Sequence, residues 1–203
     1  MNKEILESFG NIDIYLFDQL LKGRFDSCTR VLDVGCGGGR NIVYFLQNNF
    51  DVFAVDADAG AIEAVKSMAR QVAPHTSQEN FIVANAEDMP FDDASFDLVI
   101  CSAVLHFAKN KAHFEDMLRS AWRVLKPGGY FFARLASDIG IEDLVQSKNN
   151  GRYLLTDGTT RYLVNQDALE HYTQELNGEL YEPIKTTVVG DLRAMTTWCV
   201  RKK

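Results

Sequence analysis

The chain has 203 residues, with 21 Lys and Arg against 28 Asp and Glu, so its formal net charge is −7. This length fits one α/β domain with a substantial core, and we treat 1–203 as a single domain. The acidic balance argues against nucleic acid and against an anionic membrane as partners, because phosphate groups bind basic surfaces.

The sequence also predicts neither a membrane span, nor a signal peptide, nor a metal site. No stretch approaches the ~20 apolar residues of a membrane span. Glu4 and Glu7 stand where a signal peptide would be apolar. The four cysteines and four histidines show neither zinc nor redox spacing. We therefore expect a cytoplasmic protein without a metal ion.

Short strand-like apolar runs alternate with longer helix-like ones, which is typical of parallel α/β construction. An apolar stretch over 12–21 predicts a first helix. Strands are then predicted at 30–34, 52–55, 81–84, 96–101 and 130–135, and helices at 41–47, 59–69 and 112–125. Pro127, Gly128 and Gly129 are expected to end the helix over 112–125, because Pro breaks the ladder and Gly adopts positive φ.

The C-terminal third departs from this alternation. A helix is predicted at 166–176, followed by strands at 185–189 and 196–201 whose connection, 190–193, has room for a turn of helix. Between the fifth strand and that helix, 137–165 is predicted to be an insertion on the substrate side. Asp157-Gly158 predicts a hairpin turn between runs at 152–156 and 160–164. The sequence allows two interpretations of this insertion: a substrate-facing lid, or a surface hairpin without a role in binding.

The segment with the clearest chemical meaning is the glycine loop after the first strand. Gly35, Gly37 and Gly39 follow a buried strand and open a helix, an arrangement that brings backbone close to a cofactor. Asp56 ends the second strand, 21 positions after Gly35, close to the spacing of about 20 expected for a carboxylate that binds ribose hydroxyls. The alternative for Asp56 is a helix N-cap.

Two residues argue against a dinucleotide as the ligand. The nicotinamide fingerprint needs a third glycine at position 40, where Arg40 stands. Asp33 lies inside the strand, where a carboxylate would repel a pyrophosphate but suits a cationic sulfonium cofactor with an α-amino group. The alternative for Asp33 is a structural acid that accepts hydrogen bonds from the loop amides.

Four ordered motifs resemble the class I S-adenosylmethionine-dependent methyltransferases. They are the glycine segment at 32–39, the acidic strand end at 54–56, the segment at 85–91, and the strand at 96–106 followed by 125–129. Within that family, 39–46 resembles tellurite-resistance-type members and 85–91 resembles quinone-biosynthesis-type members. The resemblance implies a Rossmann-like, seven-stranded mixed sheet whose last strand is antiparallel, with helices on both faces.

The resemblance also implies S-adenosylmethionine as the cofactor and S-adenosylhomocysteine as its product. The 35–39 backbone would line the methionine half, Asp56 would accept from both ribose hydroxyls, and Ala57 would pack near the adenine. The Ala86 amide would meet an adenine ring nitrogen. Asn85 would bind the adenine amino group more weakly than the Asp of many relatives, with Glu87 or Asp88 compensating. The full predicted cofactor set is Asp33, Gly35, Cys36, Gly37, Gly39, Asp56, Ala57, Asn85, Ala86, Glu87 and Ser102.

The predicted function is in-line methyl transfer to a small molecule, in which alignment of the reactants supplies most of the catalysis. His106, after the fourth strand, is the candidate general base, with a packing role as the alternative. Tyr15, Arg152 and Arg161 are candidate substrate residues; packing of the first helix and an exposed hairpin are their alternatives. A non-catalytic S-adenosylmethionine-binding or regulatory protein and an NAD(P)-dependent oxidoreductase are the rival functions. The methyl acceptor and the oligomeric state stay open at this point.

Overall fold

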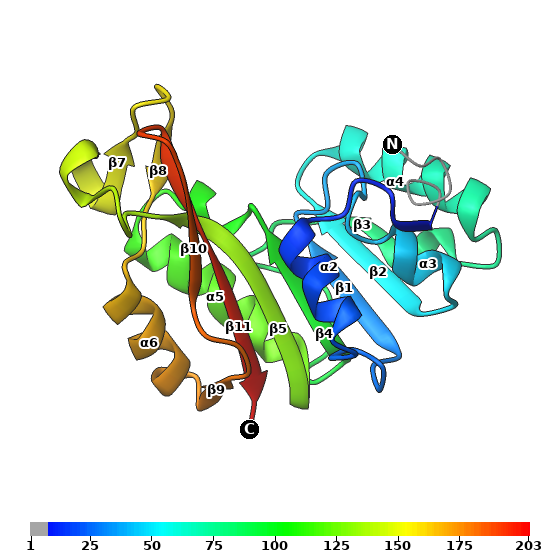
Figure 1. The fold of residues 1–203 in the computed structure, drawn as a ribbon. Coiled ribbons are helices and arrows are strands. Elements are labelled where there is room, and N and C mark those ends of the chain that lie inside the picture. The colour runs from blue at the N-terminus through cyan, green and yellow to red at the C-terminus, as the bar shows by residue number, and fades with distance from the viewer. Residues whose placement is uncertain (1–7) are drawn as a thin grey trace.

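The computed structural model describes residues 8–203, so Glu4 and Glu7 lie outside the described residues. One twisted sheet organises the chain in the order β10-β11-β5-β4-β1-β2-β3 (Figure 1). β1, β2, β3, β4 and β5 pair in parallel, and β11 pairs antiparallel with β5. The predicted mixed sheet with an antiparallel last strand is therefore confirmed. The strands are β1 Arg30–Val34, β2 Asp51–Asp56, β3 Phe81–Val83, β4 Phe96–Ser102, β5 Leu125–Ser137, β10 Lys185–Val189 and β11 Arg193–Lys202.

A short extra strand, β9 (Gly178–Leu180), pairs with the C-terminal part of β11 on the same edge as β10. The Tyr181 amide continues this pairing by donating to the Cys199 carbonyl at 3.2 Å. The edge strand is thus formed in two pieces, of which the sequence pattern predicted only the second.

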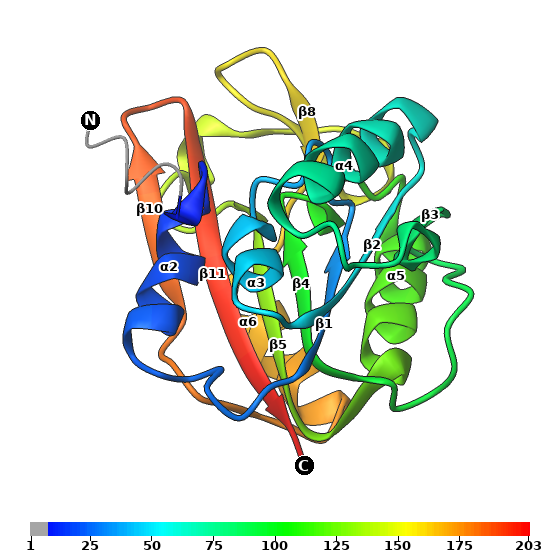
Figure 2. The ribbon, with the colours of Figure 1, turned by 90° about the vertical axis from the view of Figure 1, so that its right-hand side faces the viewer.

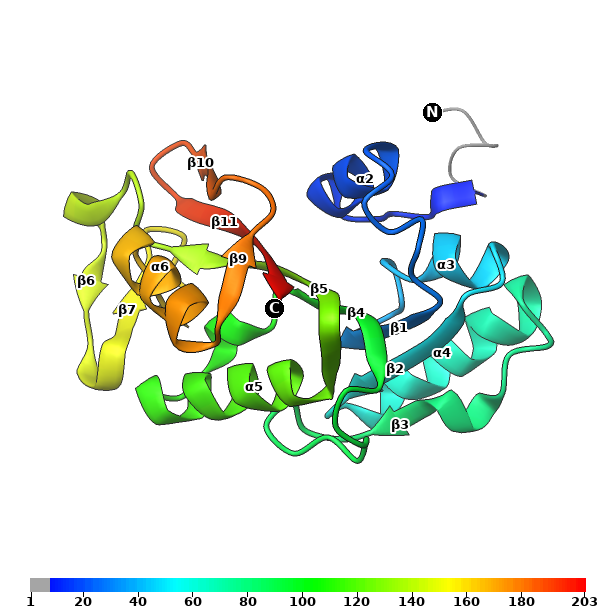
Figure 3. The same ribbon diagram turned by 90° about the horizontal axis from the view of Figure 1, so that it is seen from below.

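Helices cover both faces of the sheet, as expected. α2 (Ile14–Leu21), α3 (Val43–Gln47) and α4 (Ala59–Val72) bury apolar side chains on one face, and α5 (Lys111–Val124) and α6 (Gln166–Glu175) bury theirs on the other (Figure 3). Side chains fix the starts of the two longest helices: Asp58 accepts from Gly60 N at α4, and Asn110 accepts from His113 N at α5. Short 3₁₀ helices lie at Gln78–Asn80, Leu105–Phe107, Glu142–Leu144 and Asn149–Gly151.

The end of α5 differs from the expectation that the Pro-Gly-Gly segment stops the helix. The helix ends at Val124, and Leu125 already has extended φ and ψ and pairs with Phe96. Lys126 precedes Pro127, and a residue before proline is disfavoured in helical geometry. Residues 126–129 instead form an irregularity inside β5, with Gly128 at a φ of 79°.

The connection between β10 and β11 is a tight turn and contains no helical turn. Leu192 N donates to Val189 O at 3.1 Å, and Gly190 has a φ of 52°. β11 begins at Arg193, three residues earlier than the pattern indicated, because its pairing with β5 continues to Ser137.

The insertion after β5 forms a small antiparallel sheet of its own, β6-β7-β8. Its strands are β6 Gln146–Ser147, β7 Arg152–Leu154 and β8 Thr160–Tyr162. The β7–β8 loop bonds to the β10–β11 turn through Thr156 Oγ1, which donates to Leu192 O at 3.1 Å (Figure 1). The insertion therefore lies over the end of the sheet at which β5 terminates.

Within residues 8–203 no helix has the length and apolar character that a bilayer span requires. The four cysteines are all buried thiols without a disulfide. No group of three metal-ligating side chains comes together in this part of the chain.

Candidate functional site

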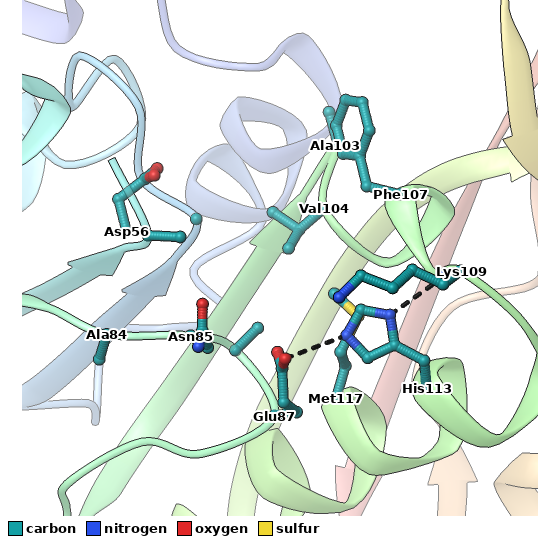
Figure 4. Close-up of a pocket in the computed structure, with 13 residues that line it drawn as sticks. Asp56, Ala84, Asn85, Glu87, Ala103, Val104, Phe107, Lys109, His113 and Met117 are labelled. Carbon is teal, nitrogen blue, oxygen red and sulfur yellow. Dashed lines mark hydrogen bonds and ion pairs between the residues drawn. The ribbon is translucent and has the colours of Figure 1, made fainter. Parts of the chain in front are cut away.

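The carboxyl ends of β1, β2 and β4 lie at the same edge of the sheet (Figure 2). A cavity of about 330 Å³ lies there (Figure 4), where an open parallel sheet binds ligands. Its volume is at the lower end of the range of about 300–1,000 Å³ that small-molecule sites occupy. Gly35 follows β1, Asp56 ends β2, and Val104 follows β4. Asn85, Ala86 and Glu87, which follow β3, form another wall.

The backbone of the glycine loop is fixed by bonds to the end of β2. Gly35 N and Cys36 N donate to Val55 O at 2.8 and 3.1 Å, and Gly37 N donates to Asp56 Oδ2 at 2.8 Å. Gly35 has a φ of 64°, and a Cβ there would lie 2.5 Å from Val104 Cγ2. Only glycine allows this chain reversal and this close approach together.

Asp56 faces the cavity as a fixed acceptor. Its Oδ2 accepts from Gly37 N and its Oδ1 from Asp58 N at 2.9 Å. A carboxylate has about four lone-pair sites, so two remain for further donors such as a pair of hydroxyls. The N-cap alternative for Asp56 is wrong, because the Asp58 side chain caps α4.

Asp33 is a buried carboxyl beneath the glycine loop, with an exposed fraction of 1%. Its Oδ2 has no hydrogen-bond partner among residues 8–203. Burial raises the pKa of Asp33 to about 8, Arg40 opposes this rise and Asp56 adds to it. The loop amides at 35–37 donate to Val55 and Asp56, so they do not compensate this carboxyl. The Oδ2 atom is thus an open acceptor that a cationic ligand would satisfy.

Asp33→Asn is expected to stabilise the ligand-free protein at pH 8 and not at pH 4. The folded-state pKa lies above the ordinary value of 3.8, so the folded state holds more protons over this window and its stability falls as pH rises. Removing the ionisable group should raise the free energy of unfolding by about 1–3 kcal/mol at pH 8. Urea unfolding at the two pH values measures this, and equal effects at both would contradict it.

The wall opposite Asp56 contains residues that the sequence analysis missed. Glu87 Oε1 lies 3.2 Å from His113 Nε2, and His113 Nδ1 accepts from Lys109 N at 3.1 Å (Figure 4). His113 and Met117 both line the cavity, one helical turn apart on α5. Their i, i+4 spacing on one face of the helix was the available signal, but the sequence analysis gave neither residue a role in the site. Phe107 and Ala103 complete the lining after β4.

Six of the predicted cofactor residues line the cavity: Gly35, Asp56, Ala57, Asn85, Ala86 and Glu87. The other five, Asp33, Cys36, Gly37, Gly39 and Ser102, are not part of its lining. Gly39 serves helix packing, because a Cβ there would lie 2.6 Å from Met68 Cε on α4.

Ser102 belongs to a polar cluster at the edge of the cavity. Asp13, buried to 2% exposure, has its Oδ2 3.0 Å from Arg134 Nη1 and 3.5 Å from Arg40 Nη2. Ser102 Oγ lies 3.5 Å from the same oxygen. The Arg134 guanidinium lies over the Tyr15 ring, 5.1 Å from its centroid. The Tyr15 hydroxyl bonds to Thr187, and its ring lines neither this cavity nor the second one described below.

His106 is positioned as a hydrogen-bond donor. It is 5% exposed, and its Nδ1 accepts from Ala136 N at 3.1 Å. Burial, together with the nearby Arg161 guanidinium, lowers its pKa to about 4. The neutral ring then carries its proton on Nε2, which leaves no lone pair for a base at neutral pH. This hydrogen bond favours the packing alternative with Nε2 as a donor, and the base role stays a prediction.

His106→Gln is expected to flatten the acid limb of the stability profile. The folded-state pKa of about 4 lies below the ordinary 6.5, so the unfolded state binds more protons between these values and stability falls as pH drops through them. The wild type should lose up to roughly 3 kcal/mol more than the variant between pH 6.5 and 4. If urea unfolding showed that wild type and His106→Gln lose the same free energy of unfolding between these pH values, His106 would not titrate in this way.

The two hairpin arginines point to different places. Arg152 Nη2 donates to Thr160 O across the hairpin at 3.1 Å and lines neither the first cavity nor the second. Arg161 lines a second cavity together with His106, and its guanidinium lies 4.8 Å from the ring centroid of Phe107, which lines the first cavity. Arg161 is therefore at the boundary between the two cavities.

Comparison with known proteins agrees with this site. A family model described as a methyltransferase domain matches residues 32–133, about half of the chain. The chain belongs to this family. The resemblance to class I S-adenosylmethionine-dependent methyltransferases is thereby confirmed at the level of the family.

Curated relatives of this methyltransferase domain act on different substrates. An uncharacterized methyltransferase of Synechocystis is 36% identical over 50% of this chain and 44% of the relative. A tRNA N(3)-cytidine methyltransferase of Xenopus tropicalis is 31% identical over 70% of this chain and 44% of the relative. A human thiol S-methyltransferase is 31% identical over 75% of this chain and 67% of the relative. The chain spans less than half the length of the first two relatives.

Solved structures share the fold. The PH0226 protein from Pyrococcus horikoshii superposes over 100% of both chains with a TM-score of 0.70 and 20% identity. A Burkholderia thailandensis 1,6-didemethyltoxoflavin-N1-methyltransferase, solved with that compound and S-adenosylhomocysteine, superposes over 91% of this chain and 75% of its own with a TM-score of 0.66 and 18% identity. At these identities the likeness concerns the fold alone.

Proposed function

We propose that this methyltransferase domain uses S-adenosylmethionine to methylate a small molecule. The observation that carries the proposal is the first cavity, in which the chain reversal at Gly35 and the fixed carboxylate of Asp56 meet at the ends of β1 and β2. The Oδ2 atom of the buried Asp33, which has no hydrogen-bond partner within residues 8–203, suits a cofactor with positive charge. Arg40, in place of a third glycine, speaks against NAD(P).

S-adenosylmethionine, when bound, would supply a methyl group that its sulfonium sulfur activates for transfer to the acceptor. The chain's own part is to bind and orient. Asp56 accepts hydrogen bonds from hydroxyl groups, and Glu87 and Asn85 form the opposite wall of the cavity. Phe107 lies between this cavity and the second one. Alignment of this kind can lower a barrier by roughly 7–11 kcal/mol without a dedicated base.

A small molecule fits the surroundings of the site better than a nucleic acid. The second cavity has a volume of about 320 Å³ and lies under the insertion, next to the first. The net charge of −7 also works against long-range attraction of a polyanion. The tRNA methyltransferase among the relatives makes RNA the alternative acceptor that a test has to include.

The test is transfer of label from methyl-labelled S-adenosylmethionine to a panel of small thiols, amines, phenols and carboxylic acids, with total tRNA as a parallel arm. The expected result is label in a small product and none in tRNA. Label in tRNA alone would contradict the small-molecule acceptor. Tight binding of S-adenosylhomocysteine without any labelled product would favour a non-catalytic binding protein.

A further inference from the structure

We infer that the second cavity binds an oxyanion group, a carboxylate or a phosphate, of the methyl acceptor. This inference names the substrate class of the proposed methyl transfer and rests on that proposal. The cavity lies where β5, the β10–β11 turn and the β7–β8 hairpin meet, and its polar lining includes Arg134, Arg161, Arg193 and His106.

The charge of this cavity is opposite to that of the whole chain. Three arginines line it, and Asp157 is the one carboxylate in its lining. Asp157 is directed mainly to its own turn, where its Oδ1 accepts from the Thr159 hydroxyl at 2.6 Å and the Thr159 amide at 2.9 Å. Its Oδ2 lies 3.7 Å from Arg193 Nη1, which is a loose contact. A positive cavity on an acidic protein concentrates small anions locally.

The arginines have guanidinium N–H groups that are not used within the described part of the protein and can donate to a ligand. A guanidinium has five N–H donors. Arg161 uses Nη1 to donate to Thr160 O at 2.9 Å, and Arg134 uses Nη1 to bond Asp13 at 3.0 Å. Arg134 Nε is buried and has no hydrogen-bond partner within residues 8–203. A buried donor without a partner is costly, and an oxyanion that bonds to Arg134 would remove that cost.

His106 adds a neutral donor to the same cavity. Because its Nδ1 accepts from Ala136 N, Nε2 carries the proton and is available to a ligand oxygen. The His106 ring therefore contributes to anion binding without changing its charge at neutral pH.

The cavity is placed so that one small acceptor can reach both sites. Val104 and Phe107 line the first cavity, while His106, in the same 3₁₀ helix as Phe107, lines the second. The Arg161 guanidinium lies over the Phe107 ring. An acceptor held by its oxyanion on the arginine side would therefore direct its other end, with the nucleophile, past Phe107 toward the first cavity.

The chain offers a matched control for the hairpin arginine. Arg161→Gln with Arg193→Gln removes two cavity cations, whereas Arg152→Gln removes a cation of the same hairpin that does not line the cavity. Arg134 is left in place, because removing it would strand the buried Asp13 carboxylate. Thermal unfolding of each variant establishes that the fold is intact.

The experiment is calorimetric titration of benzoate and of its neutral analogue benzamide at low ionic strength, with and without S-adenosylhomocysteine, and of inorganic phosphate as the second oxyanion. Benzoate should bind wild type and Arg152→Gln about 10-fold or more tightly than benzamide, and the double variant should lose at least about 10-fold in benzoate affinity. A folded double variant that binds benzoate like wild type, or equal affinities for benzoate and benzamide, would overturn the inference.

The affinity for S-adenosylhomocysteine separates this inference from the proposed function. It should be unchanged in the double variant, since neither arginine lines the first cavity. Normal S-adenosylhomocysteine binding together with no preference for benzoate would refute the anion site and leave the methyltransferase proposal intact. If the wild type did not bind S-adenosylhomocysteine, the proposed function would be refuted, whatever the benzoate result.

Discussion

Asp56→Ala is expected to weaken S-adenosylhomocysteine binding by at least about 100-fold. The carboxylate is held toward the cavity by Gly37 N and Asp58 N, with lone pairs left for two ligand hydroxyls. Two charge-assisted hydrogen bonds together contribute about 3 kcal/mol or more, which corresponds to that loss. Calorimetric titration of the variant gives the affinity directly.

The control for this variant is Asp51→Ala at the other end of the same strand. Asp51 is exposed and forms an ion pair with Arg30, far from the cavity lining. Its removal should leave the affinity within about 2-fold, because exposed ion pairs contribute little. If Asp56→Ala retained wild-type affinity while remaining folded, the assignment of the ribose acceptor would be refuted.

Gly35→Ala is expected to abolish cofactor binding and to destabilise the fold. The φ of 64° costs a residue with a Cβ roughly 1–2 kcal/mol, and that Cβ would lie 2.5 Å from Val104 Cγ2. Overpacking of this kind adds roughly 1–3 kcal/mol and displaces the loop after β4. Urea unfolding and S-adenosylhomocysteine titration measure the two effects separately.

A second substitution tests this explanation. Val104→Ala removes the methyl groups that the new Cβ would meet. The free energy of unfolding of Gly35→Ala combined with Val104→Ala should therefore regain the part lost to the clash, but not the part lost to the positive φ. Gly37→Ala is the matched control, because Gly37 has a φ of 51° and open space around its Cβ position. If the double variant were no more stable than Gly35→Ala, the contact with Val104 would not be the cause.

The parallel half of the fold could be predicted because each strand and helix there buries an apolar pattern with its own period. β1, β2 and β4 and the helices on both faces follow those patterns closely. β9 was missed because three residues with little apolar character carry no periodic signal; the pairing with β11 defines the strand. The same holds for β5, which continues through Pro127 because of its partner β4.

The sequence could predict the cavity-lining residues that come at a fixed spacing after strands, and it could not predict those that only folding brings together. Gly35 follows β1 and Asp56 ends β2 at a characteristic spacing, so the sequence alone could predict that both line the cavity. Arg134 and Arg193 lie on β5 and β11 and meet Arg161 only when the insertion folds over the sheet end. His106 could be located from the sequence, but its tautomer depends on the Ala136 amide of a neighbouring strand.

The most direct test of the central claim is calorimetric titration of the wild type with S-adenosylmethionine, with S-adenosylhomocysteine and with NADH under the same conditions. The cavity bounded by Gly35, Asp56 and Glu87 predicts saturable one-to-one binding of both sulfur ligands, with a Kd of about 10 μM or below, and no binding of NADH. A folded protein that binds NADH, or that binds neither sulfur ligand, would contradict the account.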